Sequence, residues 1–342
     1  MIEPRENVRK LKPYTSARDL VKEDNLIFLD ANENPFDNEM NRYPDPHQQE
    51  LKQALAKWLK VEPPQIFAGN GSDEVIDLAI RVYTRPGKDR IITLGPTYSM
   101  YKVQAEIQDV EIKEIALDKD FQPDTKKVME EVTERDKIIF LCSPNNPTGN
   151  LMERQRIISL VENFEGLVFV DEAYVDFAPE GSVIDLVDKY PNLLVSRTFS
   201  KAMGMAGIRL GLGIANPGII QTLSKIKYPY NVSRLTQQAA LEALSDLSDY
   251  REQVRIIVKE RDKLRIRLER LSFVKQIFRS DANFVLMEVK DAASLVQFLK
   301  EKGIVIRDRS GVVEGKELAR ITVGTPQQNK QLIEELKNFD NG

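Results

Sequence analysis

The chain has 342 residues, of which 42% are hydrophobic, so it is long enough to bury a large core in one or two domains. Its 49 basic and 53 acidic side chains give a net charge of −4, and this ordinary balance gives no reason to expect nucleic acid or an anionic membrane as a partner. No apolar run approaches the roughly 18 residues of a membrane-spanning helix, and the N-terminus has no apolar signal core. A single cysteine, Cys142, excludes a disulfide framework, and we expect a protein of the reducing cytoplasm.

The chain contains one histidine, His47, in a proline-rich segment that is typical of a turn. His47 and Cys142 are its only soft metal ligands, so we expect neither a metal site nor a Ser-His-Asp triad. Nucleotide-binding motifs are incomplete as well, because Gly211-Leu212-Gly213 continues to Asn216, where a dinucleotide-binding loop needs glycine.

Apolar runs of strand length alternate with helical patterns, which is typical of an α/β fold with a mainly parallel sheet flanked by helices. Strands are predicted over Arg90–Leu94, Glu111–Ile115, Lys137–Cys142, Leu167–Val170, Leu193–Ser196 and Arg209–Ala215. Helices are predicted over Asp73–Tyr83, Tyr98–Ile107, Thr125–Val132, Arg154–Asn163 and Gly218–Lys225.

The pattern changes near Leu247, where a long and highly charged helix is predicted over Tyr250–Leu271. Further strands are predicted over Phe284–Val289, Ile304–Arg307 and Ala319–Val323, and further helices over Ala292–Lys302 and Gln327–Phe339. We therefore expect residues 28–249 to form a large domain. Residues 1–27 and 250–342 would form a smaller α/β domain with an N-terminal arm, and the long helix would bridge the two.

The segment from Thr198 to Arg209, at the end of a short apolar strand, carries the most chemical information. Lys201 lies near the apolar Phe199 and Met203, where an amine loses its proton easily and can form a Schiff base with an aldehyde. The neighbouring hydroxyls and Arg209 are groups that bind phosphate. This combination indicates an aldehyde cofactor that carries a phosphate, pyridoxal 5'-phosphate, although Lys201 taken alone could equally be a surface lysine.

Other predicted strand ends carry polar side chains, and ligands of open α/β sheets bind beyond the carboxyl ends of the strands. Asp171 follows a buried strand, where a carboxylate is costly without a cation, and the protonated nitrogen of a pyridine ring would supply one. Tyr174 could reach the phenolic oxygen of the same ring, and Asn146 lies in the rigid Ser143–Gly149 turn. A helix N-cap for Asp171 and a packed aromatic for Tyr174 are the alternatives.

Two more segments complete the predicted pocket. The Gly69–Glu74 loop leads into an apolar helix with Ser72 or Asp73 as its cap, and the free N–H groups at such a helix start bind anions. Tyr98 follows another strand end and is placed to stack on a flat ring. An ordinary capped helix and a core aromatic are the alternatives.

Taken together, these segments resemble the fold-type-I, pyridoxal-phosphate-dependent aminotransferases. The similarity extends over nearly the whole chain and is carried by Thr198–Gly207, Ser143–Gly149, Asp171–Tyr174 and Gly71–Glu74, in the order of that family. Within it, the chain is most similar to the histidinol-phosphate aminotransferases, through Leu11–Tyr14, Asn32–Pro35, Tyr43–Asp45 and Arg320–Gly324.

The resemblance implies a role for each matching residue of the pocket. Lys201 would bind the cofactor and then move the proton. The ring would be contacted by Asp171 at its nitrogen, by Asn146 and Tyr174 at its phenolic oxygen, and by Tyr98 and Ala173 at its two faces. The phosphate would be held by Ser72, Asp73, Thr198, Ser200 and Arg209.

The resemblance also implies how a second subunit and the substrate take part. Tyr43 is expected to reach the cofactor phosphate of the neighbouring subunit, which implies a homodimer. Substrate contacts are expected from Tyr14, Asn146, Arg307 and Arg320. Arg320 would share a strand face with Leu318 and Thr322, and its planar guanidinium binds either a carboxylate or a phosphate.

The expected reaction moves an amino group between L-histidinol phosphate and 2-oxoglutarate or glutamate, in histidine biosynthesis. Three alternatives stay open: an aminotransferase for aromatic or other α-amino acids, a decarboxylase of a phosphorylated amino acid on the same scaffold, and a non-catalytic cofactor-binding or regulatory protein. The joint presence of Lys201, Asp171, Asn146 and Arg209 argues against the last of these.

Overall fold

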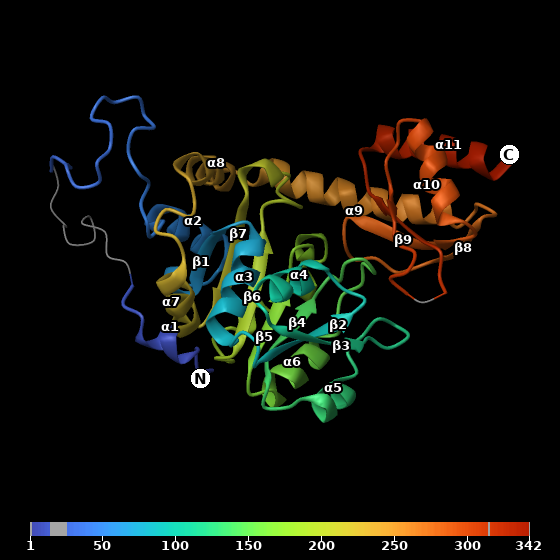
Figure 1. Ribbon diagram of the computed structural model, residues 1–342. Coiled ribbons are helices and arrows are strands. Elements are labelled where there is room, and N and C mark those ends of the chain that lie inside the picture. The colour runs from blue at the N-terminus through green and yellow to red at the C-terminus, as the bar shows by residue number, and fades with distance from the viewer. Residues whose placement is uncertain (1, 14–25, 314, 342) are drawn as a thin grey trace.

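The computed structural model describes residues 2–13, 26–313 and 315–341, and it shows two units joined by a long helix (Figure 1). Within these residues, the larger unit is built on a seven-stranded sheet with the order β1-β7-β6-β5-β4-β2-β3. The smaller unit is built on a four-stranded sheet with the order β10-β11-β9-β8. No helix in the described ranges is both long enough and apolar enough to cross a membrane.

The strands of the larger unit are β1 (Ile66–Asn70), β2 (Arg90–Gly95), β3 (Glu111–Ala116), β4 (Asp136–Cys142), β5 (Leu167–Asp171), β6 (Leu193–Thr198) and β7 (Leu210–Ala215). Its helices are α1 (Glu6–Lys10), α2 (Gln49–Leu59), α3 (Ser72–Tyr83), α4 (Met100–Ile107), α5 (Thr125–Glu131), α6 (Arg154–Asn163), α7 (Pro217–Ile226) and α8 (Arg234–Ser245). The bridging helix α9 (Ser248–Leu268) leads to β8 (Val274–Ile277), β9 (Phe284–Val289), α10 (Ala292–Glu301), β10 (Arg307–Asp308), β11 (Leu318–Thr322) and α11 (Pro326–Asn341).

The large sheet is mainly parallel, as the sequence predicts. Strands β3, β2, β4, β5 and β6 run in the same direction, whereas β7 is antiparallel to both β6 and β1. The carboxyl ends of β4, β5 and β6 therefore lie side by side at one edge of the sheet, where ligands of open α/β folds bind.

Both faces of this sheet are buried, which explains the continuous apolar runs of its central strands. In β5, Val168 and Val170 pack into a core that α2, α5, α6 and α8 cover. Leu167 and Phe169 point the other way, into a core covered by α1, α3, α4 and α7. The strand thus keeps its period of two while its first four side chains, Leu167–Val170, are all apolar.

The small sheet buries one face under its helices and turns the other toward the larger unit. Ala319 and Ile321 pack with side chains of α9, α10 and α11. Arg320, between them in β11, points the opposite way and donates a hydrogen bond to Asn146 of the larger unit.

A buried ion-pair network attaches the bridging helix to the larger unit. The Arg197 guanidinium lies 2.8 Å from Glu172 and 3.0 Å from Asp176. The hydroxyl of Tyr250, in the first turns of α9, donates to the same Asp176 carboxylate at 3.0 Å. Because all of these groups are largely removed from water, the loss of one partner leaves a buried charge unpaired.

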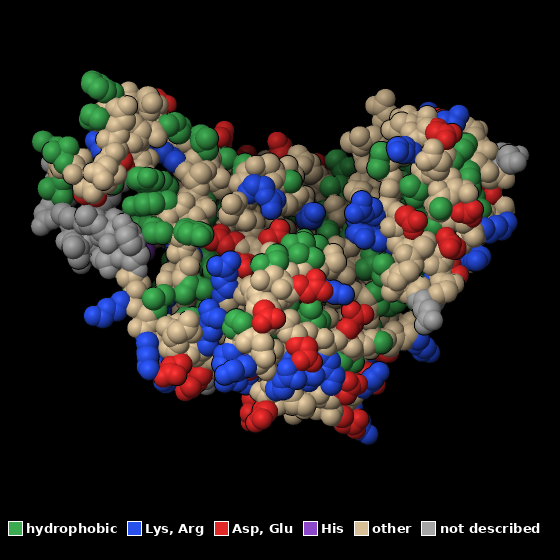
Figure 2. All heavy atoms as spheres, in the orientation of Figure 1, with side chains coloured by type: hydrophobic (Ala, Val, Ile, Leu, Met, Phe, Trp, Pro, Cys, Tyr) green, Lys and Arg blue, Asp and Glu red, His purple; other side chains and the backbone are tan. Residues whose placement is uncertain are grey.

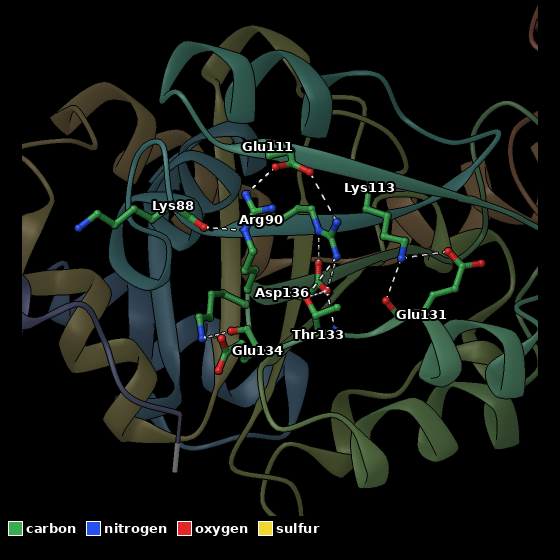
Figure 3. A network of polar contacts seen from close by, with 10 residues as sticks. Lys88, Arg90, Glu111, Lys113, Glu131, Thr133, Glu134 and Asp136 are labelled. Carbon is green, nitrogen blue, oxygen red and sulfur yellow. Dashed lines mark hydrogen bonds and ion pairs between the residues drawn. The ribbon is translucent and has the colours of Figure 1, made fainter.

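A second polar network lies at the other end of the sheet, where β2 and β4 begin (Figure 3). The Arg90 side chain donates to both oxygens of Asp136, at 2.6 and 2.8 Å, and Thr133 donates to the same carboxylate. Burial alone would raise the pKa of Asp136, but the hydrogen bonds from Arg90 and Thr133 lower it below 3.8. This network fixes the start of the parallel strands and is far from the ligand-binding edge.

Several sequence predictions differ from the structure. Elements α1, α2, α8, β1 and β8 were not predicted, and the short strand β10 was predicted over Ile304–Arg307 instead of Arg307–Asp308. The predicted cap of α3 is wrong, because the N-cap residue is Gly71 and Ser72 already begins the helix. Arg209 lies outside β7 because its φ of 55° is left-handed and ends the extended conformation before the strand. The predicted division into a large domain of residues 28–249 and a small domain of residues 1–27 and 250–342 stays a prediction. In the structure, Val8 of α1 packs into a core of the larger unit.

Gly211 of β7 brings the start of α3 close to the sheet. A Cβ at this position would lie 2.0 Å from the Ser72 nitrogen and 2.2 Å from the Gly71 carbonyl carbon. Both atoms belong to the backbone, so no side-chain rotation can relieve the overlap. The absence of a side chain at residue 211 therefore sets how near the N–H groups of α3 come to the ends of β6 and β7.

Replacing Gly211 with Ala should lower the free energy of unfolding by at least about 2 kcal/mol, because the backbone of α3 must move away from β7. Urea titration followed by circular dichroism measures this change. Gly207→Ala is the matched control, since a Cβ there meets no atom within 4 Å. Equal stability of the two variants would contradict the proposed close approach.

Candidate active site

A cavity of about 170 Å³ lies at the carboxyl ends of β4, β5 and β6 and the start of α3. It is lined by Ser72, Asp73, Tyr98, Cys142, Asn146, Asp171, Ala173, Tyr174, Thr198, Ser200, Lys201, Ala206 and Arg209. The structure thus brings together every residue that the sequence analysis assigned to the cofactor except Tyr43. A larger cavity of about 800 Å³ lies at the opposite end of the sheet and contains none of these residues.

Asp171 is a buried carboxylate that is held by three donors. The Tyr101 hydroxyl donates to it at 2.8 Å, the Ser196 hydroxyl at 2.9 Å, and the backbone N–H of Ala173 at 3.1 Å. No cation lies within ion-pair distance of Asp171 among the described residues. Burial raises the pKa of Asp171 above 3.8, and the hydrogen bonds from Tyr101 and Ser196 only partly offset this. The site therefore has one negative group whose cationic partner must come from a ligand.

Lys201 follows β6, and its amine lies 5.7 Å from the centre of the Tyr174 ring. Its side chain is open to solvent on the cavity side, yet its pKa lies below 10.5. Partial desolvation is the main cause, and the charge of Arg320 acts in the same direction, while Asp171 opposes both. A lysine with a lowered pKa is neutral more often and therefore a better nucleophile.

The phosphate-binding side of the cavity is formed by Arg209 and the start of α3. Arg209 lies 3.5 Å from the Ser200 hydroxyl and 3.6 Å from the Asp73 carboxylate. A Cβ on Gly71 would come within 2.8 Å of the Arg209 guanidinium, so the glycine leaves the space that this side chain occupies. The N–H groups of the first turn of α3 and the guanidinium together suit a bound anion.

Asn146 connects the two units at the cavity. Its side-chain oxygen accepts the hydrogen bond from Arg320, so its NH₂ group is left as the donor on the cavity side. Arg320 also lies over the Phe284 ring, 5.1 Å from the ring centre. This arrangement holds the guanidinium beside the cavity wall without a carboxylate partner among the described residues.

Among the described residues, three predicted site residues are not part of the cavity wall, namely Tyr43, Arg307 and Arg320, although Arg320 contacts Asn146 of that wall. Tyr14 lies outside the described residues. Tyr43 is stacked on Tyr230, with 4.4 Å between the ring centres, and it lines a separate hollow. Arg307 lies opposite Arg320 in the β10–β11 pair and is exposed.

The sequence analysis missed two residues that hold Asp171. Ser196 is the register partner of Asp171 in the parallel β5–β6 pair. With Thr198 it is one of two hydroxyls that lie two residues apart in β6, on either side of Arg197, and this alternation could have indicated it. Tyr101 follows Tyr98 by three residues at the start of α4, and its ring meets the Tyr98 ring edge-on at 5.5 Å. Nothing local indicates that its hydroxyl reaches a residue 70 positions away.

The comparisons with known structures define the class of protein. The crystal structure of the histidinol-phosphate aminotransferase from Clostridium acetobutylicum matches with a TM-score of 0.83 and 26% identity, over 89% of this chain and 92% of that one. The enzyme of the same name from Sinorhizobium meliloti, solved in complex with pyridoxal-5'-phosphate, matches with a TM-score of 0.78 and 25% identity, over 88% of this chain and 84% of that one. The chain therefore has the fold of the fold-type-I, pyridoxal-phosphate-dependent transferases, as predicted.

The sequence comparisons identify the family. A family model described as aminotransferase class I and II matches residues 27–336. A histidinol-phosphate aminotransferase from Flavobacterium johnsoniae is 49% identical over 336 residues, which are 97% of this chain and 96% of that protein. This chain belongs to the class I and II aminotransferase family, and it is an enzyme.

Replacing Asp171 with Asn should raise the thermal unfolding midpoint of the cofactor-free chain at pH 7 by about 2 °C, because a buried charge without a cation becomes a neutral amide. The folded chain keeps the Asp171 proton to a higher pH than the unfolded chain does, so wild-type stability falls as pH rises from 3.8 through the raised pKa. The difference in unfolding midpoint between the Asp171→Asn variant and the wild type should therefore be small in acid and increase toward pH 7. Differential scanning calorimetry across this range measures it.

Asp176→Asn is the matched control for this prediction. Asp176 is also buried, but its carboxylate pairs with Arg197, so its replacement should destabilise the chain by about 3 kcal/mol. An Asp171 variant that is less stable than the wild type at pH 7 would contradict the assignment of Asp171 as a carboxylate that lacks an internal cation.

Proposed function

We propose that the protein transfers an amino group between L-histidinol phosphate and 2-oxoglutarate or glutamate in histidine biosynthesis, with pyridoxal 5'-phosphate bound to Lys201. The observation that carries the proposal is the cavity in which Lys201, Asp171, Asn146 and Arg209 meet. The substrate is supported by the 49% identity to the Flavobacterium johnsoniae histidinol-phosphate aminotransferase across nearly the whole chain.

The residues of the cavity fit pyridoxal 5'-phosphate in charge. Asp171 would hold the protonated ring nitrogen, the cation that the described residues do not provide. The Asn146 NH₂ group and the Tyr174 hydroxyl would hold the phenolic oxygen, and Arg209 with the N–H groups of Ser72 and Asp73 would hold the phosphate. When bound, the cofactor supplies an electron sink for the negative charge that develops at the substrate's α-carbon.

Lys201 would move the proton of the reaction. Its lowered pKa gives it a larger neutral fraction, so it can accept the proton of the substrate's α-carbon as a general base and deliver it again as a general acid. The charge of Asp171 raises the pKa of the Lys201 amine, whereas the charges of Arg320 and Arg209 lower it. Their balance would keep the pKa of Lys201 suited to both steps.

Arg320 would bind the anionic group of each substrate in turn. Among the described residues, its only hydrogen-bonded side-chain partner is the neutral amide of Asn146, so a carboxylate of glutamate or the phosphate of histidinol phosphate would gain a charge-assisted, two-point contact. Arg307 and Tyr14 are proposed to assist it. An aromatic amino acid also carries a carboxylate, so this set selects for an anionic group, and the choice of histidinol phosphate is supported by the sequence identity.

We also propose that the active unit is a homodimer in the cytoplasm, in which Tyr43 reaches the partner's cofactor phosphate. The support is an apolar arm surface formed by Ile27, Leu29, Phe36, Met40 and Tyr43, of which Ile27 and Leu29 are 87% and 84% exposed. Figure 2 shows the corresponding gathering of hydrophobic side chains over the N-terminal part of the chain, at the upper left. A surface of this kind on an isolated chain indicates a protein partner. A cytoplasmic location is consistent with the free thiol of Cys142 on the cavity wall.

The substrate proposal is tested with a panel of amino donors assayed against 2-oxoglutarate. Histidinol phosphate should give the highest kcat/KM, ahead of phenylalanine and other α-amino acids, and no carbon dioxide should be released from O-phosphothreonine. A preference for phenylalanine would favour the aromatic aminotransferase, and carbon dioxide release would favour the decarboxylase.

Lys201→Ala should lower turnover by at least about 1,000-fold while cofactor is still bound, weakly, by the other cavity residues. Borohydride reduction of the wild type followed by peptide mapping should tag the peptide that contains Lys201. Lys300→Ala, a change on an exposed face of α10, is the control and should leave turnover unchanged. Normal turnover in the Lys201 variant, or a tag on another peptide, would refute the assignment.

The role of Tyr43 across the dimer is tested by mixing two inactive or weakened chains, Lys201→Ala and Tyr43→Ala. A hybrid dimer contains one site with an intact Lys201 and an intact partner Tyr43, so mixing should restore activity to about half of the wild-type value per hybrid, because one of its two sites is complete. That site should bind the cofactor with wild-type affinity. Activity that stays at the level of the unmixed Tyr43 variant would mean that Tyr43 acts within its own chain or not at this site.

A further inference from the structure

The strand pair that carries Arg320 holds another arginine, which neither the sequence analysis nor the family resemblance singled out. Arg309 follows β10, and its backbone N–H donates to the Leu318 carbonyl of β11 at 2.7 Å. Arg307 is the register partner of Arg320 and precedes Arg309 by two residues. Because side chains alternate along a strand, Arg307, Arg309 and Arg320 lie on the same face of this strand pair. The opposite face, with Ala319 and Ile321, belongs to the core of the smaller unit.

Arg309 has an unsatisfied polar group. Its Nε is buried and has no hydrogen-bond partner among the described residues, and no ion pair to its guanidinium is found there either. A buried donor of this kind is costly unless something binds it. The backbone of Arg309 already completes the strand pairing, so the side chain is not needed for that purpose.

The charge of Arg309 acts on two residues of the site, Arg320 and Tyr174. Its charge lowers the pKa of Arg320, second only to burial and ahead of the effect of Arg307. It also acts on Tyr174, whose pKa is raised by burial and lowered in part by Arg320 and Arg309. Arg307, by contrast, is exposed. Figure 2 shows a group of basic side chains on the smaller unit where it faces the larger one.

We infer that Arg309 is a specificity-determining residue that binds the phosphate of the substrate together with Arg320. The inference rests on the proposed function. An α-carboxylate has two oxygens and one charge, which the fork of Arg320 alone can satisfy. A phosphate monoester has three terminal oxygens and nearly two charges at pH 7, so a second inward guanidinium is matched to it. Arg309 thus favours phosphorylated amines over simple amino acids.

The test compares the two half-reactions in holoenzyme variants. Arg309→Met should lower kcat/KM for histidinol phosphate by about 10- to 100-fold, mainly through KM, because one charge-assisted contact is lost. The kcat/KM of the half-reaction with glutamate should fall by a factor about ten times smaller than the factor for histidinol phosphate. Arg309→Lys keeps the charge and should retain part of the phosphate preference. Arg255→Met removes an exposed arginine of α9 that pairs with Glu252 and is the control, with neither half-reaction changed.

The outcomes separate this inference from the proposed function. If the wild type uses histidinol phosphate and Arg309→Met changes both half-reactions equally, or neither, the inference is overturned and the proposed function stands. Equal losses with a lowered thermal midpoint would assign Arg309 a structural role. If the wild type does not use histidinol phosphate, the proposed function fails, and inorganic phosphate as a competitor of glutamate decides the inference. If inorganic phosphate competes with glutamate less strongly in Arg309→Met than in the wild type, the inference is supported. Equal competition in the two proteins overturns the inference.

Discussion

The carboxylate of Asp171 is the charge around which this site is arranged. The protein buries it and supplies three hydrogen-bond donors, Tyr101, Ser196 and Ala173, but no cation among the described residues. In a site of low dielectric, a ligand cation that meets this carboxylate gains more than it would in water. The chain without its ligand therefore holds an unfavourable interaction at the centre of its sheet, and binding relieves it. This is a common reason why an active site is less stable than the same fold could be.

The cationic side chains of the site lie away from Asp171, so the charges around the cavity are arranged asymmetrically. Arg209 and the start of α3 line one part of the wall, Asp171 lines another, and Arg320 lies beside the wall in contact with Asn146, with the charge of Arg309 near it. A planar ring with a positive nitrogen and a negative phosphate fits this pattern in only one orientation. Lys201 lies between these charges, so its pKa reports their balance. The left-handed backbone of Arg209, with φ of 55°, is part of the cost of placing a guanidinium beside a helix start.

Much of this site could be predicted from the sequence, because parallel strands place their carboxyl ends together. Asp171, Lys201 and Asn146 each follow a different strand, and the parallel order alone brings them to one edge. What could not be predicted depends on contacts between distant segments. The hydroxyl of Tyr101 reaches Asp171 from a helix 70 positions away, and β1 is a short, glycine-containing strand that exists because β7 pairs with it. Arg309 could not be recognised from the sequence, because an arginine in a solvated turn and an arginine in a binding site have the same local sequence pattern. Only the strand register separates the two. The roles of Tyr43 and Tyr14 depend on a second chain and on residues outside the described ranges, and they stay predictions.

The two units are joined by contacts of different kinds, and this difference has a consequence for binding. At α9, the network of Arg197, Asp176 and Tyr250 is buried and ionic, so it fixes the helix to the larger unit. Beside the cavity, Arg320 donates to the neutral amide of Asn146, and this contact is weaker than the paired hydrogen bonds of a guanidinium to a carboxylate or a phosphate. An anionic substrate offers Arg320 a better partner at the same place. We therefore expect the substrate to replace a contact that already holds β11 against the larger unit, so that recognition of the anion and the position of the small sheet depend on one side chain.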